Sequence, residues 1–212
     1  MALTTTRICV VRHGETAWNA EGRIQGELDV PLSAVGHAQA RAVANALAGE
    51  DFAAIYSSDL GRARHTAEAT AHLRRQPLNL VAALRERHYG VFQGLTYEEA
   101  QRRHPEEFAG HRRRDPDLAL GDGESLRQLE VRITTCFARL AARHAGGQIL
   151  AFTHGGVLDV LHRRATGAPL TSPRDFEIPN AALNWIELAD DGRWSILVWA
   201  DRDHLLSARD EL

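Results

Sequence analysis

The sequence predicts an α/β fold, a three-layer sandwich in which helices cover both faces of a mostly parallel central sheet. Short apolar runs alternate along the chain with segments whose apolar residues recur at helical spacing, which is typical of parallel strands joined by helices. Two of these runs are apolar throughout, as expected for strands buried on both faces. The last two runs are joined by the tight turn Asp190-Asp191-Gly192, which predicts an antiparallel edge strand.

The predicted strands are apolar and rich in β-branched residues. The first, Ile8 to Val11, ends in Arg12-His13-Gly14, and the fourth, Ile149 to Thr153, ends in His154-Gly155-Gly156. The strands in chain order are 8–11, 53–56, 78–81, 149–153, 182–188 and 194–199.

The predicted helices have apolar stripes and polar residues that can cap their first turns. Ser33 and Ser125 can each accept a hydrogen bond from a free N–H group, and Ser57-Ser58-Asp59 can do so for the helix that follows. The predicted helices cover 33–48, 60–72, 97–104, 125–140 and 157–164.

The remaining segments are polar or irregular. Residues 17–32 and 84–94 are expected to be loops at strand ends, and an insertion at about 95–124, with residues 105–124 of low regularity, is expected to shape specificity. The cluster Arg112-Arg113-Arg114 is interpreted as solvated, with attraction of an acidic substrate as its alternative. The tail from Asp201 is interpreted as a polar surface segment.

The composition is that of a globular domain, and we expect residues 1–212 to form one. Of the 212 residues, 44% are hydrophobic and 25% charged, and the net charge of −3 provides no field that would attract nucleic acid or an anionic membrane. No apolar run approaches the roughly 18 residues of a membrane-spanning helix. We therefore expect a cytoplasmic monomer or homodimer, with no nucleic-acid or membrane partner.

The two cysteines, Cys9 and Cys136, have no metal-ligand spacing. Cys9 lies in the first predicted strand and Cys136 on the apolar stripe of a predicted helix. Both are interpreted as buried thiols, and no metal site is expected.

Two histidines follow the predicted parallel strands. Because the carboxyl ends of parallel strands share one rim of a sheet, His13 and His154 can converge there. Arg12 precedes His13, and Arg62 falls in the first turn of a helix, where free N–H groups already favour an anion. Taken singly, each has an ordinary alternative as a turn histidine or a solvated arginine.

Together with the loop carboxylate Glu86, these residues can transfer a phosphoryl group. His13 would attack as neutral imidazole, with its other ring nitrogen held by a backbone carbonyl. Arg12 and Arg62 would hold the phosphoryl oxygens, and His154, if protonated, would add a donor. Glu86 would give a proton to the departing alcohol and take one from water; its alternative is a structural ion pair with a neighbouring arginine.

Several blocks, in order, resemble the histidine phosphatase superfamily, in the branch of the cofactor-dependent phosphoglycerate mutases and related phosphatases. The most specific is Val11-Arg12-His13-Gly14-Glu15-Thr16-Ala17-Trp18-Asn19. The others are Arg23-Ile24-Gln25-Gly26, Leu32-Ser33, Tyr56-Ser57-Ser58-Asp59-Leu60 with Arg62-Ala63, Leu84-Arg85-Glu86 with Tyr89-Gly90, Gly123-Glu124-Ser125 and Thr153-His154-Gly155-Gly156.

The resemblance implies a phosphoglycerate mutase-like fold and assigns roles to residues. His13 would be the phosphorylated nucleophile and Glu86 the proton donor, with Arg12, Arg62 and His154 forming the phosphate pocket. The implied substrate-binding residues are Asn19, Thr16, Gln25 and Gly155. No metal is implied, because the cations of the protein take over its charge-stabilising role.

The acceptor of the phosphoryl group distinguishes two functions. Water as acceptor gives a phosphatase for a small phosphorylated metabolite, with phosphorylated carboxylic acids as candidates. A retained hydroxyl gives a mutase that needs priming by 2,3-bisphosphoglycerate. The interval between Glu86 and His154 and the segment after the last strand are shorter than in the mutases that the chain resembles, which favours the phosphatase. The block Glu86-Arg87-His88-Tyr89-Gly90 favours the mutase instead, because in the mutases that it resembles the arginine and tyrosine help to hold the carboxylate of phosphoglycerate. A non-catalytic protein that binds phosphorylated ligands is a further alternative.

Overall fold

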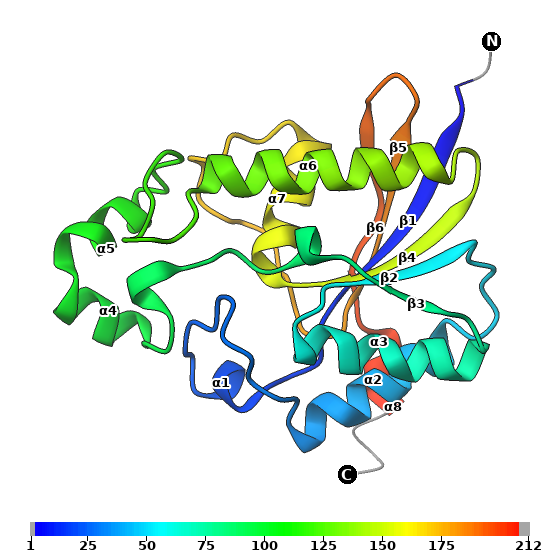
Figure 1. Cartoon of the computed structure of the whole chain (residues 1–212), viewed down its shortest axis with the longest axis horizontal. Coiled ribbons are helices and arrows are strands. Elements are labelled where there is room, and N and C mark those ends of the chain that lie inside the picture. The colour runs from blue at the N-terminus through cyan, green and yellow to red at the C-terminus, as the bar shows by residue number, and fades with distance from the viewer. Residues whose placement is uncertain (1–2, 208–212) are drawn as a thin grey trace.

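A six-stranded sheet forms the middle of the protein. The computed structural model describes residues 3–207, and Figure 1 shows the sheet crossing the centre of the molecule. The strands are β1 (Thr5–Arg12), β2 (Ala54–Ser57), β3 (Leu78–Leu80), β4 (Gln148–Thr153), β5 (Leu183–Ala189) and β6 (Trp194–Asp201), in the order β3-β2-β4-β1-β5-β6. Strands β3, β2, β4 and β1 are parallel, whereas β5 is antiparallel to both β1 and β6. The predicted mixed sheet is confirmed.

The register of β1 and β4 places the two histidines side by side. The apolar residues of both strands are fully buried, as expected for the centre of a covered sheet. Val11 lies opposite Phe152 and Arg12 opposite Thr153, so both strands end at the same level. The N–H of His13 donates to the carbonyl of Thr153 at 2.9 Å, which extends the pairing by one residue.

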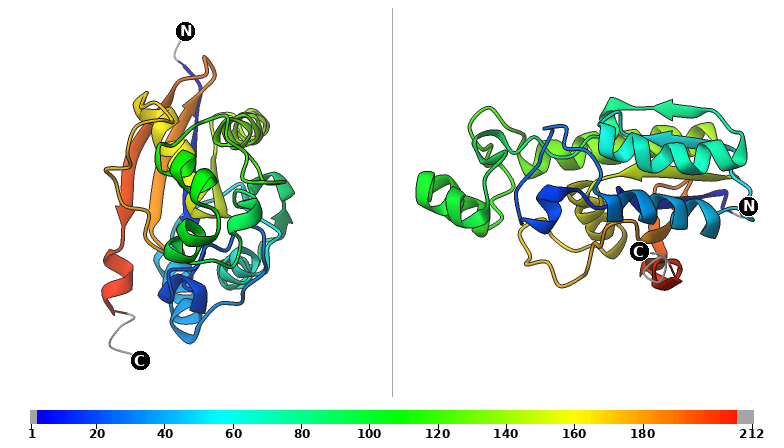
Figure 2. Two further views of the ribbon diagram at one scale, coloured as in Figure 1. Left: turned by 90° about the vertical axis from the view of Figure 1, so that its left-hand side faces the viewer. Right: turned by 90° about the horizontal axis from the view of Figure 1, so that it is seen from below.

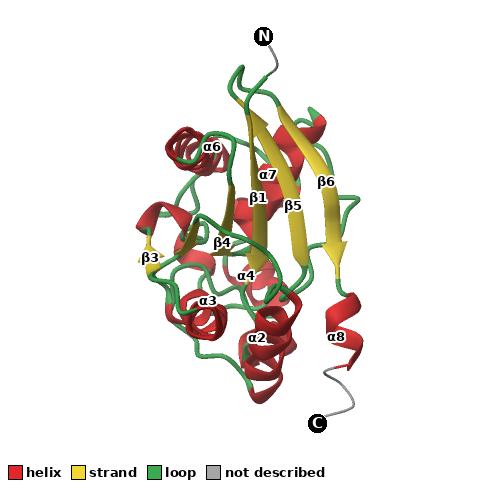
Figure 3. Ribbon diagram, turned by 90° about the vertical axis from the view of Figure 1, so that its right-hand side faces the viewer, coloured by secondary structure: helices red, strands yellow, loops and turns green. Residues whose placement is uncertain are grey.

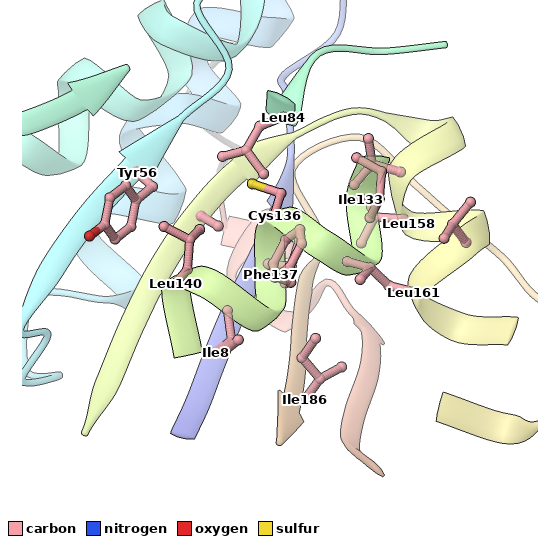
Figure 4. Close-up of a cluster of buried hydrophobic side chains, with 14 of the residues drawn as sticks. Ile8, Tyr56, Leu84, Ile133, Cys136, Phe137, Leu140, Leu158, Leu161 and Ile186 are labelled. Carbon is pink, nitrogen blue, oxygen red and sulfur yellow. The ribbon is translucent and has the colours of Figure 1, made fainter. Parts of the chain in front are cut away.

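Helices cover both faces of the sheet (Figures 1 and 3). One face carries α6 (Leu126–Arg143) and α7 (Gly155–Thr166), and the other carries α2 (Ala34–Ala46), α3 (Gly61–Arg74) and α8 (Asp203–Ser207). Because strand side chains alternate between faces, Ile8 packs with α6 and α7 (Figure 4), whereas Cys9 packs in the core on the opposite face. Cys9 and Cys136 are buried free thiols, as predicted.

The helix starts show where capping predictions succeed and fail. The hydroxyls of Ser33 and Ser125 accept the N–H groups of Gly36 and Gln128, as predicted. The prediction that Ser57-Ser58-Asp59 caps the helix after β2 holds only for Ser58, whose hydroxyl accepts the N–H of Leu60 at 3.3 Å, whereas the carboxylate of Asp59 binds Arg85. There the carboxylate of Asp29, from the loop before α2, accepts the first N–H group.

The insertion forms a helical projection beyond the carboxyl ends of the strands, on the left of Figure 1 and of the right-hand view in Figure 2. It contains α4 (Tyr97–Arg103) and α5 (Pro105–Arg112), and the helical turns η1 (Ala82–Leu84) and η2 (Gly90–Phe92) precede it. The interpretation of residues 105–124 as irregular is thus wrong over α5. Pro105 occupies the first helical position, where its missing N–H costs nothing.

Two further predictions need correction. Arg114 is not solvated, since it donates to the carboxylate of Asp159 and to the carbonyl of Leu170, while Arg112 and Arg113 are exposed. The tail forms α8, whose Leu205 packs against the core beside α2; residues 208–212 of the predicted surface tail lie outside the described residues. Within residues 3–207, no helix is long and apolar enough to cross a membrane.

Candidate active site

A cavity of about 460 Å³ opens at the carboxyl ends of β1 and β4. It gathers residues from the first strand, the loop with α1 (Ala17–Ala20), the start of α3, the Glu86 loop, the insertion and the start of α7. Of the predicted site residues it is lined by Arg12, His13, Asn19, Gln25, Arg62, Glu86 and Gly155. The structure therefore brings together residues that are up to 143 positions apart in the sequence, from Arg12 to Gly155.

The ring of His13 is buried and held in one orientation. Its Nδ1 lies 2.7 Å from the carbonyl oxygen of Gly14, and its Nε2 receives the Nε–H of Arg62 at 3.3 Å. A carbonyl only accepts and a guanidinium only donates, so these partners place the proton on Nδ1 and a lone pair on Nε2. Burial, and then the charges of Arg62 and Arg12, lower the pKa of His13 well below its usual value. The imidazole is therefore neutral and carries a free lone pair, as nucleophilic attack requires.

His154 is fully buried beside His13. The two ring centroids are 5.2 Å apart. Burial is the main cause that lowers the pKa of His154, and the nearby Arg62, His13 and Arg12 add to it. A charged His154 was considered only as a condition for an added donor, and this lowered pKa means that the condition is not met at neutral pH. The ring is neutral and offers one N–H donor.

Arg62 and Arg12 provide the positive charge. Arg62 is completely buried, and its terminal nitrogens donate to the carbonyls of Gly26 and Leu28 at 2.6 and 2.8 Å. Burial lowers the pKa of Arg62 to about 10, so it remains charged at neutral pH. Arg12 donates to the carbonyl of Ile178. Because carbonyls bring no counter-charge, both cations stay available to an anion.

The carboxylate of Glu86 is anchored at the first turn of α7. Its Oε1 accepts the N–H groups of Arg87 and Gly156 at 2.8 and 3.0 Å, and its Oε2 accepts only that of Gly156. The alternative of an ion pair with a neighbouring arginine is wrong, because Arg85 pairs with Asp59 and Arg87 donates to carbonyls. Oε2 is the oxygen that is freer to exchange a proton.

The Glu86 loop is supported by an ion pair that sequence reasoning did not assign. Arg132 on α6 binds both carboxylate oxygens of Glu124 and donates to the carbonyls of residues 83, 85 and 86. The block Gly123-Glu124-Ser125 thus holds the loop that carries Glu86.

Asn19 lines the cavity, and hydrogen bonds to its side-chain oxygen hold its orientation. Its Oδ1 accepts the N–H and hydroxyl of Thr16, and lies 3.3 Å from Nδ2 of Asn180, which also donates to the carbonyl of His13. These donors leave the Nδ2 group of Asn19 for a ligand. Thr16 itself is buried and does not line the cavity, and Asn180 was missed because it lies in a proline-rich linker without periodicity.

Further arginines line the cavity outside the predicted site residues, in a part of the lining called the far wall. It is made up of Arg87, Arg114 and Arg174 with the aromatic side chains of Tyr89 and His111. The resemblance pointed to Arg87 with Tyr89, and residues 112–114 were considered as a cluster that attracts an acidic substrate, whereas nothing in the sequence pointed to Arg174. Arg87 is buried and donates to the carbonyls of Glu124 and Leu118, and its guanidinium lies 5.2 Å from the ring of Tyr89. Burial raises the pKa of Tyr89, which keeps its hydroxyl neutral.

The two lowered imidazole pKa values predict a pH-dependent stability. Below about pH 6.5, the unfolded chain binds protons at residues 13 and 154 that the folded protein excludes. The free energy of unfolding should therefore decrease as the pH is lowered, by up to about 1.4 kcal/mol per pH unit for each imidazole. Denaturant unfolding of the wild type and of His13→Asn between about pH 7 and 5.5 measures this dependence. The free energy of unfolding should change less steeply with pH in the variant, and equal slopes for the two proteins would contradict the expectation.

The comparisons with known proteins agree with this geometry. The histidine phosphatase superfamily (branch 1) matches residues 8–202. Phosphoglycerate mutase-like protein 4 of Arabidopsis thaliana is 44% identical over 203 residues, which are 93% of this chain and 86% of the relative. A metal-independent phosphoserine phosphatase of the same plant is 40% identical over 205 residues, which are 95% of this chain and 84% of the relative.

A solved structure supports the same assignment. A mycobacterial glucosyl-3-phosphoglycerate phosphatase superposes with a TM-score of 0.84 at 29% identity, covering 93% of this chain and 100% of that one. The covered six-stranded sheet and the paired histidines at its strand ends define an α/β protein of the histidine phosphatase class. The chain belongs to the histidine phosphatase superfamily.

Proposed function

We propose that this protein is a metal-independent phosphatase that hydrolyses a small phosphorylated metabolite through a phosphohistidine at residue 13. The observation that carries the proposal is the state of His13, a buried neutral imidazole with its lone pair on Nε2 beside two arginines. Among residues 3–207, no group of three His, Cys, Asp or Glu side chains could hold a metal ion. The family membership and the relatives named as phosphatases support the reaction class.

The first half-reaction transfers the phosphoryl group to the protein. Nε2 of His13 attacks phosphorus, and the bond to the leaving oxygen breaks as that oxygen takes the proton of Glu86. Arg12 and Arg62 hold the three equatorial oxygens, on which negative charge spreads in the transition state. Nδ1–H of His13 keeps its bond to the Gly14 carbonyl, which stabilises the charge that the ring gains.

The second half-reaction returns the protein to its starting state. Glu86, now ionised, takes a proton from water, whose oxygen attacks phosphorus as the bond to Nε2 breaks. Inorganic phosphate leaves and Glu86 is protonated again. Since one carboxyl acts as acid and then as base, Oε2 must face both the leaving oxygen and the incoming water.

The far wall favours a substrate with a second negative charge. Arg87, Arg114 and Arg174 line the cavity, and only Arg114 of these three pairs with a carboxylate, Asp159, among the described residues. A carboxylate on the substrate would complement this wall, because an arginine can donate two parallel hydrogen bonds to the two oxygens of a carboxylate. The relatives named as phosphoserine and glucosyl-3-phosphoglycerate phosphatases also act, by name, on phosphorylated carboxylic acids. We therefore infer that the substrate is a phosphorylated carboxylic acid.

Phosphoserine and 3-phosphoglycerate test this proposal directly. The purified protein is given each compound and, as a comparison, phenyl phosphate, and free phosphate is followed in the presence of a chelator. We expect a higher kcat/KM for the two carboxylates than for phenyl phosphate. Equal kcat/KM values for all three compounds would contradict the proposed recognition of a carboxylate. Loss of activity with the chelator would contradict the metal-independent mechanism.

A mutase is the second candidate, favoured by the same far wall, because a mutase must retain the product while the phosphoryl group moves. The assay follows 2-phosphoglycerate and free phosphate from 3-phosphoglycerate, with and without 2,3-bisphosphoglycerate. Phosphate release that is independent of the bisphosphate supports the phosphatase. Isomer formation faster than phosphate release, and only with the bisphosphate, would make the protein a mutase.

A methyl group placed on α7 should disturb Glu86 selectively. A Cβ at Gly156 would meet Oε1 of Glu86 too closely, so in Gly156→Ala the carboxylate must move. We expect kcat to fall by about 10²-fold, since displacements of about 1 Å at a reacting group cost that much. Thermal unfolding should change little, because only a side-chain end moves. Gly49→Ala, where a Cβ meets nothing within 4 Å, is the control; an unchanged kcat in Gly156→Ala would contradict the placement of Glu86.

A further inference from the structure

The hydroxyl of Ser58 is the one polar side-chain group that the described residues place on the ring of His154. Ser58 follows β2 and is fully buried, and its Oγ lies 2.8 Å from Nε2 of His154. Its backbone N–H donates to the carbonyl of Phe152 in β4, so the serine is fixed relative to the strand that carries His154. The proposed reaction as described so far gives this residue no part.

The direction of the Ser58–His154 hydrogen bond follows from the other partners. Oγ of Ser58 already accepts the N–H of Leu60 at 3.3 Å, and among residues 3–207 the only hydrogen-bond acceptor for its own proton is Nε2 of His154. If the imidazole donated instead, the serine proton would be buried without an acceptor, and Nδ1 of His154 would hold a buried lone pair without a donor. Buried polar groups are rarely left in that condition.

The other ring nitrogen of His154, Nδ1, is buried and lacks a hydrogen-bond partner within the described part of the chain. The pKa of His154 is lowered, so the ring carries a single proton, and its position decides whether Nδ1 donates or repels an anion. A lone pair there would oppose the negative oxygens of a phosphoryl group beside His13.

We propose that Ser58 is a positioning residue that keeps the proton of His154 on Nδ1, so that this N–H binds a phosphoryl oxygen in the transition state. The two neighbouring imidazoles then have opposite functions fixed by different partners. The Gly14 carbonyl leaves His13 a lone pair for attack on phosphorus, and the Ser58 hydroxyl leaves His154 a proton for donation. This inference rests on the proposed phosphatase function and adds a residue to it.

Nitrogen NMR of histidine side chains measures the proton position directly. In the wild type without ligand at neutral pH, we expect His154 to show a protonated Nδ1 and an unprotonated Nε2. His154→Gln identifies the resonances. A wild-type His154 protonated on Nε2 would overturn the proposal without any Ser58 variant.

Ser58→Ala then tests the consequence for the reaction. We expect His154 to lose its single tautomer and kcat/KM for phenyl phosphate to fall by about 10- to 100-fold, the loss seen when a residue that fixes the tautomer of a metal-ligating imidazole is removed. Ser57→Ala is the matched control, since Ser57 is equally buried but its hydroxyl donates to a backbone carbonyl. It should keep both the tautomer and the rate.

The outcomes separate this proposal from the function on which it rests. A Ser58→Ala protein whose rate and tautomer are both unchanged overturns the proposal, as does one whose rate falls while Nδ1 stays protonated. Neither result affects the phosphorylation of His13 in the wild type. Conversely, a wild type that never becomes phosphorylated removes the function while leaving the tautomer measurement valid.

Discussion

His13→Ala should abolish turnover of every phosphomonoester that the wild type hydrolyses. The substitution removes the lone pair that forms the bond to phosphorus. His154 cannot replace it, because in the described part of the chain its Nε2 faces the hydroxyl of Ser58 and its Nδ1 has no partner that orients it. Loss of a nucleophile lowers kcat by roughly 10⁴-fold or more, even when the binding groups remain. Steady-state release of phosphate from phenyl phosphate and from phosphoserine measures the effect.

A matched histidine variant makes this result specific. His37 is exposed on α2, away from the cavity, and His37→Ala should keep the wild-type rate. His13→Ala should still bind inorganic phosphate, because Arg12 and Arg62 are unchanged. If the variant hydrolyses phosphomonoesters at a rate close to the wild type, His13 is not the nucleophile. If the wild type itself binds phosphorylated ligands and turns over none, the protein is a non-catalytic binder.

Glu86→Gln should produce the second largest loss, and its size should depend on the leaving group. The amide has the shape of the carboxyl and can still accept the N–H groups of Arg87 and Gly156 through its oxygen, but it cannot supply a proton. Substrates that leave as alkoxides, such as phosphoserine, should lose about 10²- to 10⁴-fold in kcat. p-Nitrophenyl phosphate, whose leaving group needs no proton, should lose much less in the rate of enzyme phosphorylation.

The leaving-group comparison is the decisive part of this experiment. Single-turnover rates with both substrates isolate the phosphorylation step, and Glu98→Gln, a change at an exposed position on α4, is the control. Equal losses for the two substrates would contradict a proton-donor role for Glu86 and indicate a structural or binding role instead.

The sequence predicted which residues lie close together where local signals and sheet geometry coincide. His13 and His154 each follow a strand of the sheet centre and precede glycine, and the parallel register of β1 and β4 brings their ring centroids to 5.2 Å. Arg62 lies in the first turn of α3, as predicted. These residues could be found because their positions relative to a strand end or a helix start determine where they lie.

The errors arose where the partner of a residue is distant in the sequence. Arg114 was interpreted as solvated because its neighbours are charged, yet its partner Asp159 is 45 residues away on α7. Of the predicted capping block Ser57-Ser58-Asp59, only Ser58 accepts an N–H group of the helix start; Arg85 binds the carboxylate of Asp59, and Asp29 accepts the N–H of Gly61. Such pairings depend on tertiary packing, which overrides the local preference of a polar side chain.

The far wall was predicted only in part, and residues that orient the site, such as Asn180, were not predicted, for a physical reason. Arg87, Arg114 and Arg174 come from three segments without regular periodicity, and Asn180 lies in a linker. Their convergence is determined by the insertion and by the chain after α7, neither of which has an apolar pattern that fixes its path.

Rapid quenching during turnover tests the central claim most directly. The wild type is mixed with a labelled phosphomonoester, stopped in alkali to preserve phosphoramidate bonds, and analysed by mass spectrometry of its peptides. The account predicts a phosphoryl group on the peptide that contains His13, formed within one turnover and absent from His13→Ala. Turnover without any phosphorylated protein, or with the phosphoryl group on another residue, would contradict it.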